Sequence, residues 1–243
     1  MARLKQHTES EGTADDAHYL NHRLTEIYRL LFASYGPQHW WPADTPFEVI
    51  VGAILTQSAA WGNVEKAISN LKQARVMTPA SLRKLPQSKL AKLVYPSGYY
   101  NAKALKLKSF VEHLEEAHQD SLEKLFSLDI HRLRSELLNI HGIGPETADS
   151  IILYAAHLPI FVIDAYTRRI LTRLGLSPSG DNYHAFQELF MGNLPADKKL
   201  FNEYHALLVR HGKEVCKKSP LCPDCCLRQL CPSTSLRAGL SMV

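Results

Sequence analysis

The chain has 243 residues, 45% of them apolar, with 28 basic and 24 acidic side chains and a formal net charge of +4. This length can bury a full core, and we expect two lobes. The small positive charge favours an anionic partner only weakly. Because no run of about 18 apolar residues occurs and residues 1–17 lack the apolar centre of a signal peptide, the sequence predicts a protein of the reducing cytosol, neither membrane-spanning nor stapled by disulfides.

The predicted elements are helices throughout, so the fold class is all-α. Residues 1–15 are polar, and we expect them to be disordered. Apolar side chains then recur at helical spacing until Gly36 and Pro37. Further periodic segments, separated by Pro, Gly or Ser, begin near residues 45, 63, 78, 88, 100, 121, 131, 145, 164, 181 and 198. The run PIFVID is the one good strand candidate, and it is too isolated to build a sheet.

The stretch HGIGPETADS joins a helix ending near Ile140 to another beginning at Pro145. Gly142 and Gly144 can take positive φ and allow another backbone to come close, and proline suits the first position of a helix. The N–H groups left free at that helix start, together with the positive end of its dipole, can bind a phosphate. The alternative is an ordinary corner between two helices that uses glycines for close packing.

The hairpin also resembles a known family. The spacing of seven residues is similar to the helix-hairpin-helix of the endonuclease III superfamily of DNA glycosylases: Leu137, Ile140, Gly142, Ile143, Gly144, Thr147 and Ala148. The resemblance implies that this hairpin grips the DNA backbone without reading bases, through Gly142, Ile143, Gly144 and Thr147. It also implies that Asp164, in VIDAYTRRI, is catalytic. An N-cap role is the alternative for Asp164, and the two are compatible, because an ionised carboxylate near a deoxyribose can stabilise an oxocarbenium-like transition state or position water.

All five cysteines fall in one segment near the end of the chain, which is typical of a metal site. Four of them form the pattern C-x5-C-x2-C-x5-C: Cys216, Cys222, Cys225 and Cys231. This pattern resembles the [4Fe-4S] loop of endonuclease III relatives, whose first spacer has six residues rather than five. The resemblance implies a structural [4Fe-4S] cluster and leaves Cys226 as a spare thiol. A structural zinc site with the same four thiolates is the alternative.

The tryptophans predict a base pocket. The segments WWP, GAILTQ and PSGYYNAKA resemble the 3-methyladenine branch of the superfamily, over roughly residues 38 to 215. In that branch aromatic side chains sandwich the extruded base, which implies a pocket built from Trp40, Trp41 and Trp61, with Pro42 completing its wall. Plain core packing is the alternative for each tryptophan.

Two further residues are assigned from the same resemblance. Gln57 is similar to the glutamine that fills the hole left by the flipped nucleotide, the alternative being a polar loop side chain. Lys213, in RHGKEV, is similar to a lysine near the active site of the 3-methyladenine branch, the alternative being a surface lysine.

The residue at position 146 bears on whether the enzyme can also cut the DNA strand. Superfamily members that also cut the strand carry a lysine there, two residues after the second glycine, and its amine attacks the sugar to form a Schiff base. A carboxylate cannot form an imine, so the sequence predicts an enzyme without strong lyase activity. Glu146 is either a first-turn acid stabilised by the helix dipole or a source of negative potential in a pocket for a cationic base.

Together these features predict a monofunctional DNA glycosylase of base excision repair that hydrolyses the bond to an alkylated purine such as 3-methyladenine. The alternatives are a glycosylase for mismatched or oxidised pyrimidines, a non-catalytic module that binds damaged DNA, and a lyase that uses another lysine such as Lys213. The expected partner is double-stranded DNA with a damaged base, and we expect a monomer that is cytoplasmic and nucleoid-associated if the source is a prokaryote. The resemblance places a central helical domain at residues 38–155 and a cluster lobe at 16–37 and 156–243.

Overall fold

The computed structural model describes residues 14–233, with side chains described from residue 18 onward. Helices and turns make up this part of the chain and no strand occurs in it, which confirms the all-α prediction. The apolar run 159–163 is extended but pairs with no other strand among these residues. Of the segment expected to be disordered, residues 1–13 lie outside the described range. None of the described helices is both long enough and apolar enough to span a bilayer.

The helices follow the predicted segments closely, and Pro, Gly and capping residues set their ends. Their bounds in chain order are α1 (Ala14–Tyr35), α2 (Pro46–Leu55), α3 (Trp61–Gln73), α4 (Pro79–Lys84), α5 (Gln87–Leu93), η1 (Tyr95–Ser97), α6 (Tyr100–His118), α7 (Leu122–Phe126), α8 (Ile130–Asn139), α9 (Pro145–Ser150), η2 (Ile151–Ala155), α10 (Ala165–Arg173), α11 (Tyr183–Met191), α12 (Lys198–Glu214), η3 (Cys222–Asp224) and η4 (Arg228–Leu230).

One predicted helix differs from expectation. The segment 145–158 carries a single helical pattern, but its α-helical part ends at Ser150 and the chain continues as the π-helical turn η2. Such turns insert an extra residue into the helical repeat and often accompany functional sites. Here the wide turn contains Tyr154, whose hydroxyl reaches His205 of α12.

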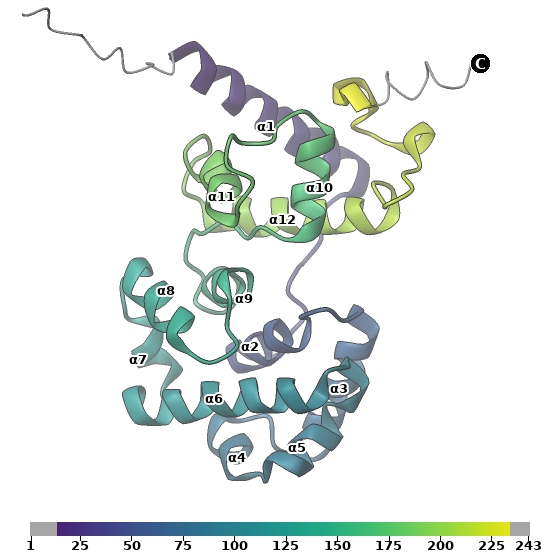
Figure 1. Ribbon diagram of the computed structural model, residues 1–243. Helices are drawn as coiled ribbons and strands as arrows, with labels where there is room; N and C mark the ends of the chain where they lie inside the picture. The colour runs from purple at the N-terminus through teal and green to yellow at the C-terminus, as the bar shows by residue number, and fades with distance from the viewer. Residues whose placement is uncertain (1–13, 234–243) are drawn as a thin grey trace, which may run out of the picture.

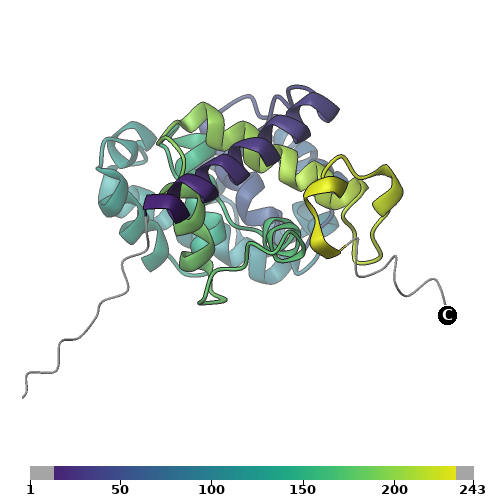
Figure 2. The ribbon, with the colours of Figure 1, turned by 90° about the horizontal axis from the view of Figure 1, so that it is seen from above.

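The helices form two groups with the chain passing between them (Figure 1). One group contains α2 to α9. The other contains α1 and α10 to α12, with α12 packed against both α1 and α10, and the cysteine segment lies beside the end of α12 (Figures 1 and 2). The lobe boundaries near residues 38 and 156 stay a prediction.

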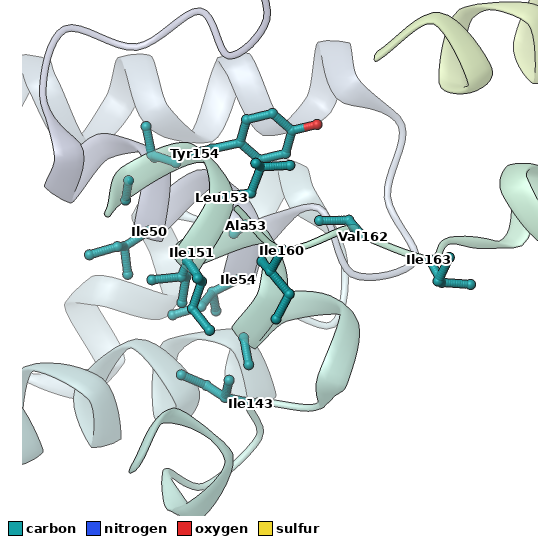
Figure 3. Close-up of a cluster of buried hydrophobic side chains, with 14 of the residues drawn as sticks. Ile50, Ala53, Ile54, Ile143, Ile151, Leu153, Tyr154, Ile160, Val162 and Ile163 are labelled. Carbon is teal, nitrogen blue, oxygen red and sulfur yellow. The ribbon is translucent and has the colours of Figure 1, made fainter. Parts of the chain in front are cut away.

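A buried apolar cluster holds the hairpin and the loop before Asp164 against α2. Figure 3 shows Ile50 and Ile54 of α2 facing Ile151 of η2, with Ile143 of the hairpin loop beside them. The extended run is buried in the same region, since Ile160, Phe161, Val162 and Ile163 are at most 3% exposed. Because interiors are packed as densely as crystals, movement of one of these segments disturbs the others.

A buried carboxylate links the same segments by hydrogen bonds. Asp149 of α9 is fully buried, and it accepts from Arg134 of α8 at 2.7 Å and from Gln187 of α11 at 2.7 Å. Gln187 also donates to the backbone carbonyl of Phe161 at 2.7 Å. Tyr183 hydrogen bonds to Asp149 as well, and its hydroxyl accepts from the N–H of Ile163 at 3.3 Å. A single carboxylate therefore orders both helices of the hairpin and the backbone that leads to Asp164.

Replacing this carboxylate should destabilise the protein. Asp149→Asn keeps the shape but leaves the Arg134 charge unpaired, and we expect the free energy of unfolding to fall by about 3 kcal/mol, the low end for a buried pair because Arg134 is 27% exposed. Asp181→Asn removes a largely exposed partner of Arg168 and is the matched control, with a change within about 0.5 kcal/mol. Urea unfolding followed by circular dichroism measures both, and equal stability of the two variants would contradict the role given to Asp149.

Candidate active site

A pocket of about 370 Å³ lies where the two groups of helices meet. Its walls come from the segment before α2, the turn between α2 and α3, α9, the start of α10 and α12. Eight residues predicted from the sequence line it: Trp40, Trp41, Gln57, Trp61, Glu146, Thr147, Asp164 and Lys213. The fold thus brings together side chains that are up to 173 positions apart in the chain.

The three tryptophans form one aromatic wall. The ring centroids of Trp40, Trp41 and Trp61 are 4.7 to 5.4 Å apart, with tilted or edge-on contacts. Each indole is half-buried, so none of them is a plain core residue. Gly52 of α2 makes room for this wall, because a Cβ at that position would lie 3.0 Å from the Trp41 ring. The wall therefore offers partly exposed aromatic faces of the kind that stack on a planar or cationic group.

Pro42 does not take part in the wall as predicted. It is exposed and lies outside the pocket lining. The chain turns away after Trp41, whose indole lies against Gly52, and reaches the N-cap of α2 at Thr45.

Asp164 is buried, and it both caps a helix and lines the pocket. Its Oδ1 accepts from the N–H of Thr167 at 2.7 Å, so it is the N-cap of α10. Its other oxygen, Oδ2, lies 3.9 Å from Nε2 of His205. The cap fixes the carboxylate and leaves Oδ2 available in the pocket.

His205 and Tyr154 belong to the site and were missed in the sequence. The Tyr154 hydroxyl lies 2.5 Å from Nδ1 of the buried His205. Burial raises the pKa of Tyr154 and lowers that of His205, so the phenol keeps its proton and donates it to a neutral imidazole. Nε2 then carries the ring proton, and it has no hydrogen-bond partner in the described part of the chain. The sequence signal for it is weak: His205 stands two helical turns before Lys213 on α12, on the same face.

Glu146 lies at the opening of the pocket, where solvent reaches it. Desolvation by the surrounding protein atoms and, to a smaller extent, the negative charge of Asp164 raise its pKa to about 7, against the opposing effect of Arg168. Glu146 also lies in the first turn of α9, where the helix dipole favours the ionised form and so acts in the opposite direction. Glu146 therefore changes charge near neutral pH.

The side chain of Gln57 is held against the hairpin by hydrogen bonds. Its amide nitrogen donates to the carbonyl oxygen of Gly142 at 3.1 Å and to Oγ1 of Thr147 at 2.8 Å, and its oxygen accepts from Lys106. Gly142 has φ +83°, and a Cβ there would overlap the Lys106 stem at 2.3 Å. The turn after α2 and the hairpin loop are thus held together around a position that only glycine fits.

The hairpin residues divide into anchors and exposed positions. Ile143 is 4% exposed, and its N–H is bonded to the Ile140 carbonyl, so it anchors the loop in the core and presents neither group to a ligand. Thr147 is likewise buried. Gly144 is exposed and caps α9, whose first turn leaves N–H groups unpaired within the helix. Of the four hairpin residues predicted to bind DNA, Gly144 fits the role best and Ile143 does not fit it.

Lys213 lies at the rim of the pocket. It is exposed and lies two turns along α12 from His205. Among the described lining residues it is the one lysine, and the position after the hairpin holds Glu146 instead. Any amine chemistry in this pocket would have to use Lys213.

The cysteine segment gathers its thiols next to α10 and α12. Arg173 donates to Sγ of Cys216 at 3.2 Å, while Sγ of Cys231 lies 3.2 Å from the Arg173 carbonyl. Sγ of Cys225 lies 3.5 Å from Nε2 of His211. Cys226 interacts with Ser34 of α1, as suits the thiol outside the set of four.

The spacing of the sulfur atoms tests which metal group fits. Among the described residues, no three cysteines have sulfurs all within 4.8 Å of one another. A tetrahedral zinc site with bonds of about 2.3 Å holds its sulfurs roughly 3.8 Å apart. The wider arrangement leaves room for a bulkier iron–sulfur cluster with four thiolate ligands.

Arginines of α10 hold this segment in place. Arg169 donates to the carbonyls of Cys216 at 2.8 Å and Gly212 at 2.9 Å. Arg173 donates to the carbonyls of Lys217 at 2.6 Å and Lys218 at 2.9 Å. The helix that Asp164 caps is therefore also the support of the cysteine segment.

A helical hairpin packed beside a pocket that holds a capped carboxylate and a wall of indole rings defines a class of enzyme, the helix-hairpin-helix DNA glycosylases. Residues 51–196 match the family model of the HhH-GPD superfamily base excision DNA repair protein. The chain belongs to this superfamily.

Relatives agree with this assignment. The chain is 44% identical over 211 residues to a protein of Methanocaldococcus jannaschii provisionally named a DNA repair glycosylase, covering 86% of this chain and 96% of that protein. It is 29% identical over 187 residues to endonuclease III of Sulfolobus acidocaldarius, covering 76% and 81% of the two chains.

Solved structures share the fold. The 3-methyladenine DNA glycosylase of H. pylori, bound to 1,N6-ethenoadenine, superposes with a TM-score of 0.69 at 28% identity and covers 82% of this chain and 97% of its own. Endonuclease III in a trapped covalent complex with DNA superposes with a TM-score of 0.75 at 22% identity, covering 93% and 99% of the two chains. The second likeness concerns the fold alone.

Proposed function

We propose that this DNA glycosylase is monofunctional and releases an alkylated purine, such as 3-methyladenine, from double-stranded DNA. The observation that carries the proposal is the composition of the pocket, in which three indole rings and Asp164 line one cavity while a glutamate stands at the lysine position of the strand-cleaving enzymes. The H. pylori structure supports the choice of substrate, because it is a 3-methyladenine DNA glycosylase with a modified adenine bound.

Recognition of the base follows from the charges of the pocket. An N3-alkylated adenine is cationic, and a cation over an aromatic face gains roughly 0.5 to 2 kcal/mol. Glu146, when ionised, adds negative potential at the pocket opening. A cationic base is also a good leaving group, so the enzyme needs no strong acid to protonate it.

The chemistry needs a water molecule and Asp164. As the bond between the base and the sugar breaks, its electron pair stays on the departing base, which becomes neutral. Positive charge develops on the sugar and is stabilised by the Asp164 carboxylate. The water oxygen forms a bond to the anomeric carbon, and Asp164 Oδ2 takes the proton that this water loses.

His205 positions that water. Its Nε2–H lies 3.9 Å from Asp164 Oδ2, which is too long for a direct hydrogen bond and suits one shared water molecule. The water accepts from Nε2–H and donates to the carboxylate. Tyr154 enforces the required tautomer by donating to Nδ1.

The cofactor we propose is a [4Fe-4S] cluster held by Cys216, Cys222, Cys225 and Cys231. Supporting it are the cysteine spacing and the sulfur positions, which among the described residues form no trio within 4.8 Å, as a bound zinc ion would require. When bound, the cluster crosslinks the C-terminal segment and performs no step of base release. The residues that take part in catalysis all lie in the separate pocket.

The direct test uses duplex DNA treated with radiolabelled dimethyl sulfate. Released bases are identified by chromatography, and strand breaks are counted with and without alkali. We expect 3-methyladenine in the released fraction, breaks only after alkali, and no trapping of protein on DNA by borohydride. Asp164→Asn should lose release by at least about a hundredfold while keeping the helix cap, because asparagine is as good an N-cap as aspartate.

The other outcomes separate the alternatives. Release of mismatched or oxidised pyrimidines without purines would move the enzyme to the endonuclease III type. Breaks without alkali, or borohydride trapping that Lys213→Gln abolishes, would make it a lyase. Binding of damaged DNA without any release would leave a non-catalytic module.

The charge of Glu146 should appear in the pH profile of single-turnover release of 3-methyladenine. Because its pKa is raised to about 7, the side chain is neutral below that pH and anionic above it, and the rate on a cationic base should rise between pH 6 and 8. Glu146→Gln, which stays neutral, should lose this rise and keep the low-pH rate. A wild-type rise that persists in Glu146→Gln would assign the titration to another group.

His205 should behave as a positioning residue. His205→Leu removes the donor to the water, and the single-turnover rate should fall about a hundredfold while affinity for DNA stays unchanged. His205→Gln retains an N–H donor at a similar reach and should recover a measurable part of the rate. If the leucine variant excises as fast as wild type, or if glutamine rescues nothing, the water-positioning role is wrong.

A further inference from the structure

Three side chains of the kind that bind metals meet outside the pocket lining, between α6 and α8. His113 and His118 come from the last two turns of α6, and Glu136 comes from α8. Nε2 of His113 lies 2.7 Å from Oε1 of Glu136, and Nε2 of His118 lies 2.5 Å from the same oxygen. The three ligand atoms all lie within 4.8 Å of one another, and no other trio of His, Cys, Asp or Glu in the described residues is as compact.

The donor set suits zinc. Two imidazole nitrogens and one carboxylate oxygen are common ligands of this ion, at about 2.0 to 2.2 Å from the metal. Tetrahedral angles at those bond lengths place ligand atoms roughly 3.3 Å apart. The observed separations of 2.7 and 2.5 Å are those of hydrogen bonds and need to widen by well under 1 Å, which small side-chain rotations supply.

The burial of the trio fits an ion that enters from solvent and is then held. The side chains of His118, Glu136 and His113 are 11%, 24% and 29% exposed. They are thus shielded enough to resist competition by water, yet none is sealed in the core. The two histidines share one oxygen, so the three ligand atoms already converge on a single point.

We propose that His113, His118 and Glu136 bind one zinc ion, with a fourth coordination position left to water. The ion crosslinks the end of α6 to α8, and α8 is the first helix of the hairpin, ending at Asn139 just before the hairpin loop. Zinc bound there would stiffen the support of the hairpin. The proposal rests on this trio alone and stands whether or not the enzyme acts on alkylated purines.

The test is equilibrium dialysis of the full-length protein, with its cysteine-bound iron intact, against buffered zinc ions. Metal analysis should give one zinc per chain and unchanged iron. His118→Gln and Glu136→Gln should each weaken zinc binding at least tenfold, the order of loss caused by removing even an outer partner of a metal site. His131→Gln is the matched control, because His131 is an exposed histidine on the same α8 and should bind zinc as wild type does.

Two further readouts keep the proposal falsifiable. Zinc X-ray absorption should show nitrogen and oxygen ligands at about 2.0 to 2.2 Å, whereas zinc in the cysteine segment would show sulfur at about 2.3 Å. Zinc should raise the melting temperature of wild type and His131→Gln and leave that of folded His118→Gln unchanged. Absence of zinc uptake, sulfur ligation, or equal affinity in wild type and both cluster variants would each overturn the proposal.

Discussion

The burial of one negative charge organises this molecule. A fully buried carboxylate is tolerated only when donors surround it, and Asp149 obtains them from two helices, from Arg134 of α8 and from Gln187 and Tyr183 of α11. Gln187 and Tyr183 also hydrogen bond to the backbone before Asp164. The hairpin and Asp164 are therefore not placed independently. Any arrangement that satisfies Asp149 also sets the distance between the hairpin loop and the Asp164 carboxylate.

Helix α10 extends this coupling to the cysteine segment. Its first residue follows the Asp164 cap, and its last turns carry the arginines that hold the backbone of residues 212–218. Since α10 is a short rigid rod, loss of order in the cysteine segment reaches the helix on which Asp164 depends. This arrangement gives the proposed cluster a structural effect on the active site without any part in the reaction.

The sequence predicted local structure where local chemistry leaves a pattern, as at the hairpin turn before Pro145 and the N-cap Asp164. It failed where the outcome depends on packing. Pro42 directly follows the pocket residues Trp40 and Trp41, but it is exposed, whereas the Trp41 ring packs against Gly52. Ile143 lies in the hairpin motif, but its side chain is buried in the core beside α2.

The other features that the sequence did not predict depend on contacts between segments that are far apart in the chain. The ionisation of Glu146 depends on desolvation and on Asp164, 18 positions along the chain, and periodicity carries no information on either. In the sequence, His205 looks like any histidine on an amphipathic helix. Only the fold places it beside Tyr154 and Asp164. His113, His118 and Glu136 belong to two helices whose register against each other cannot be read from spacing.

The wall of indole rings also determines the fluorescence of the protein. The chain contains three tryptophans, and all three line the pocket within 5.4 Å of one another. When excitation lies beyond the tyrosine absorption, the ultraviolet emission of the protein thus arises at the pocket, with no contribution from indoles elsewhere. Filling of the pocket changes the surroundings of every indole at once, so the protein carries its own unlabelled reporter of pocket occupancy.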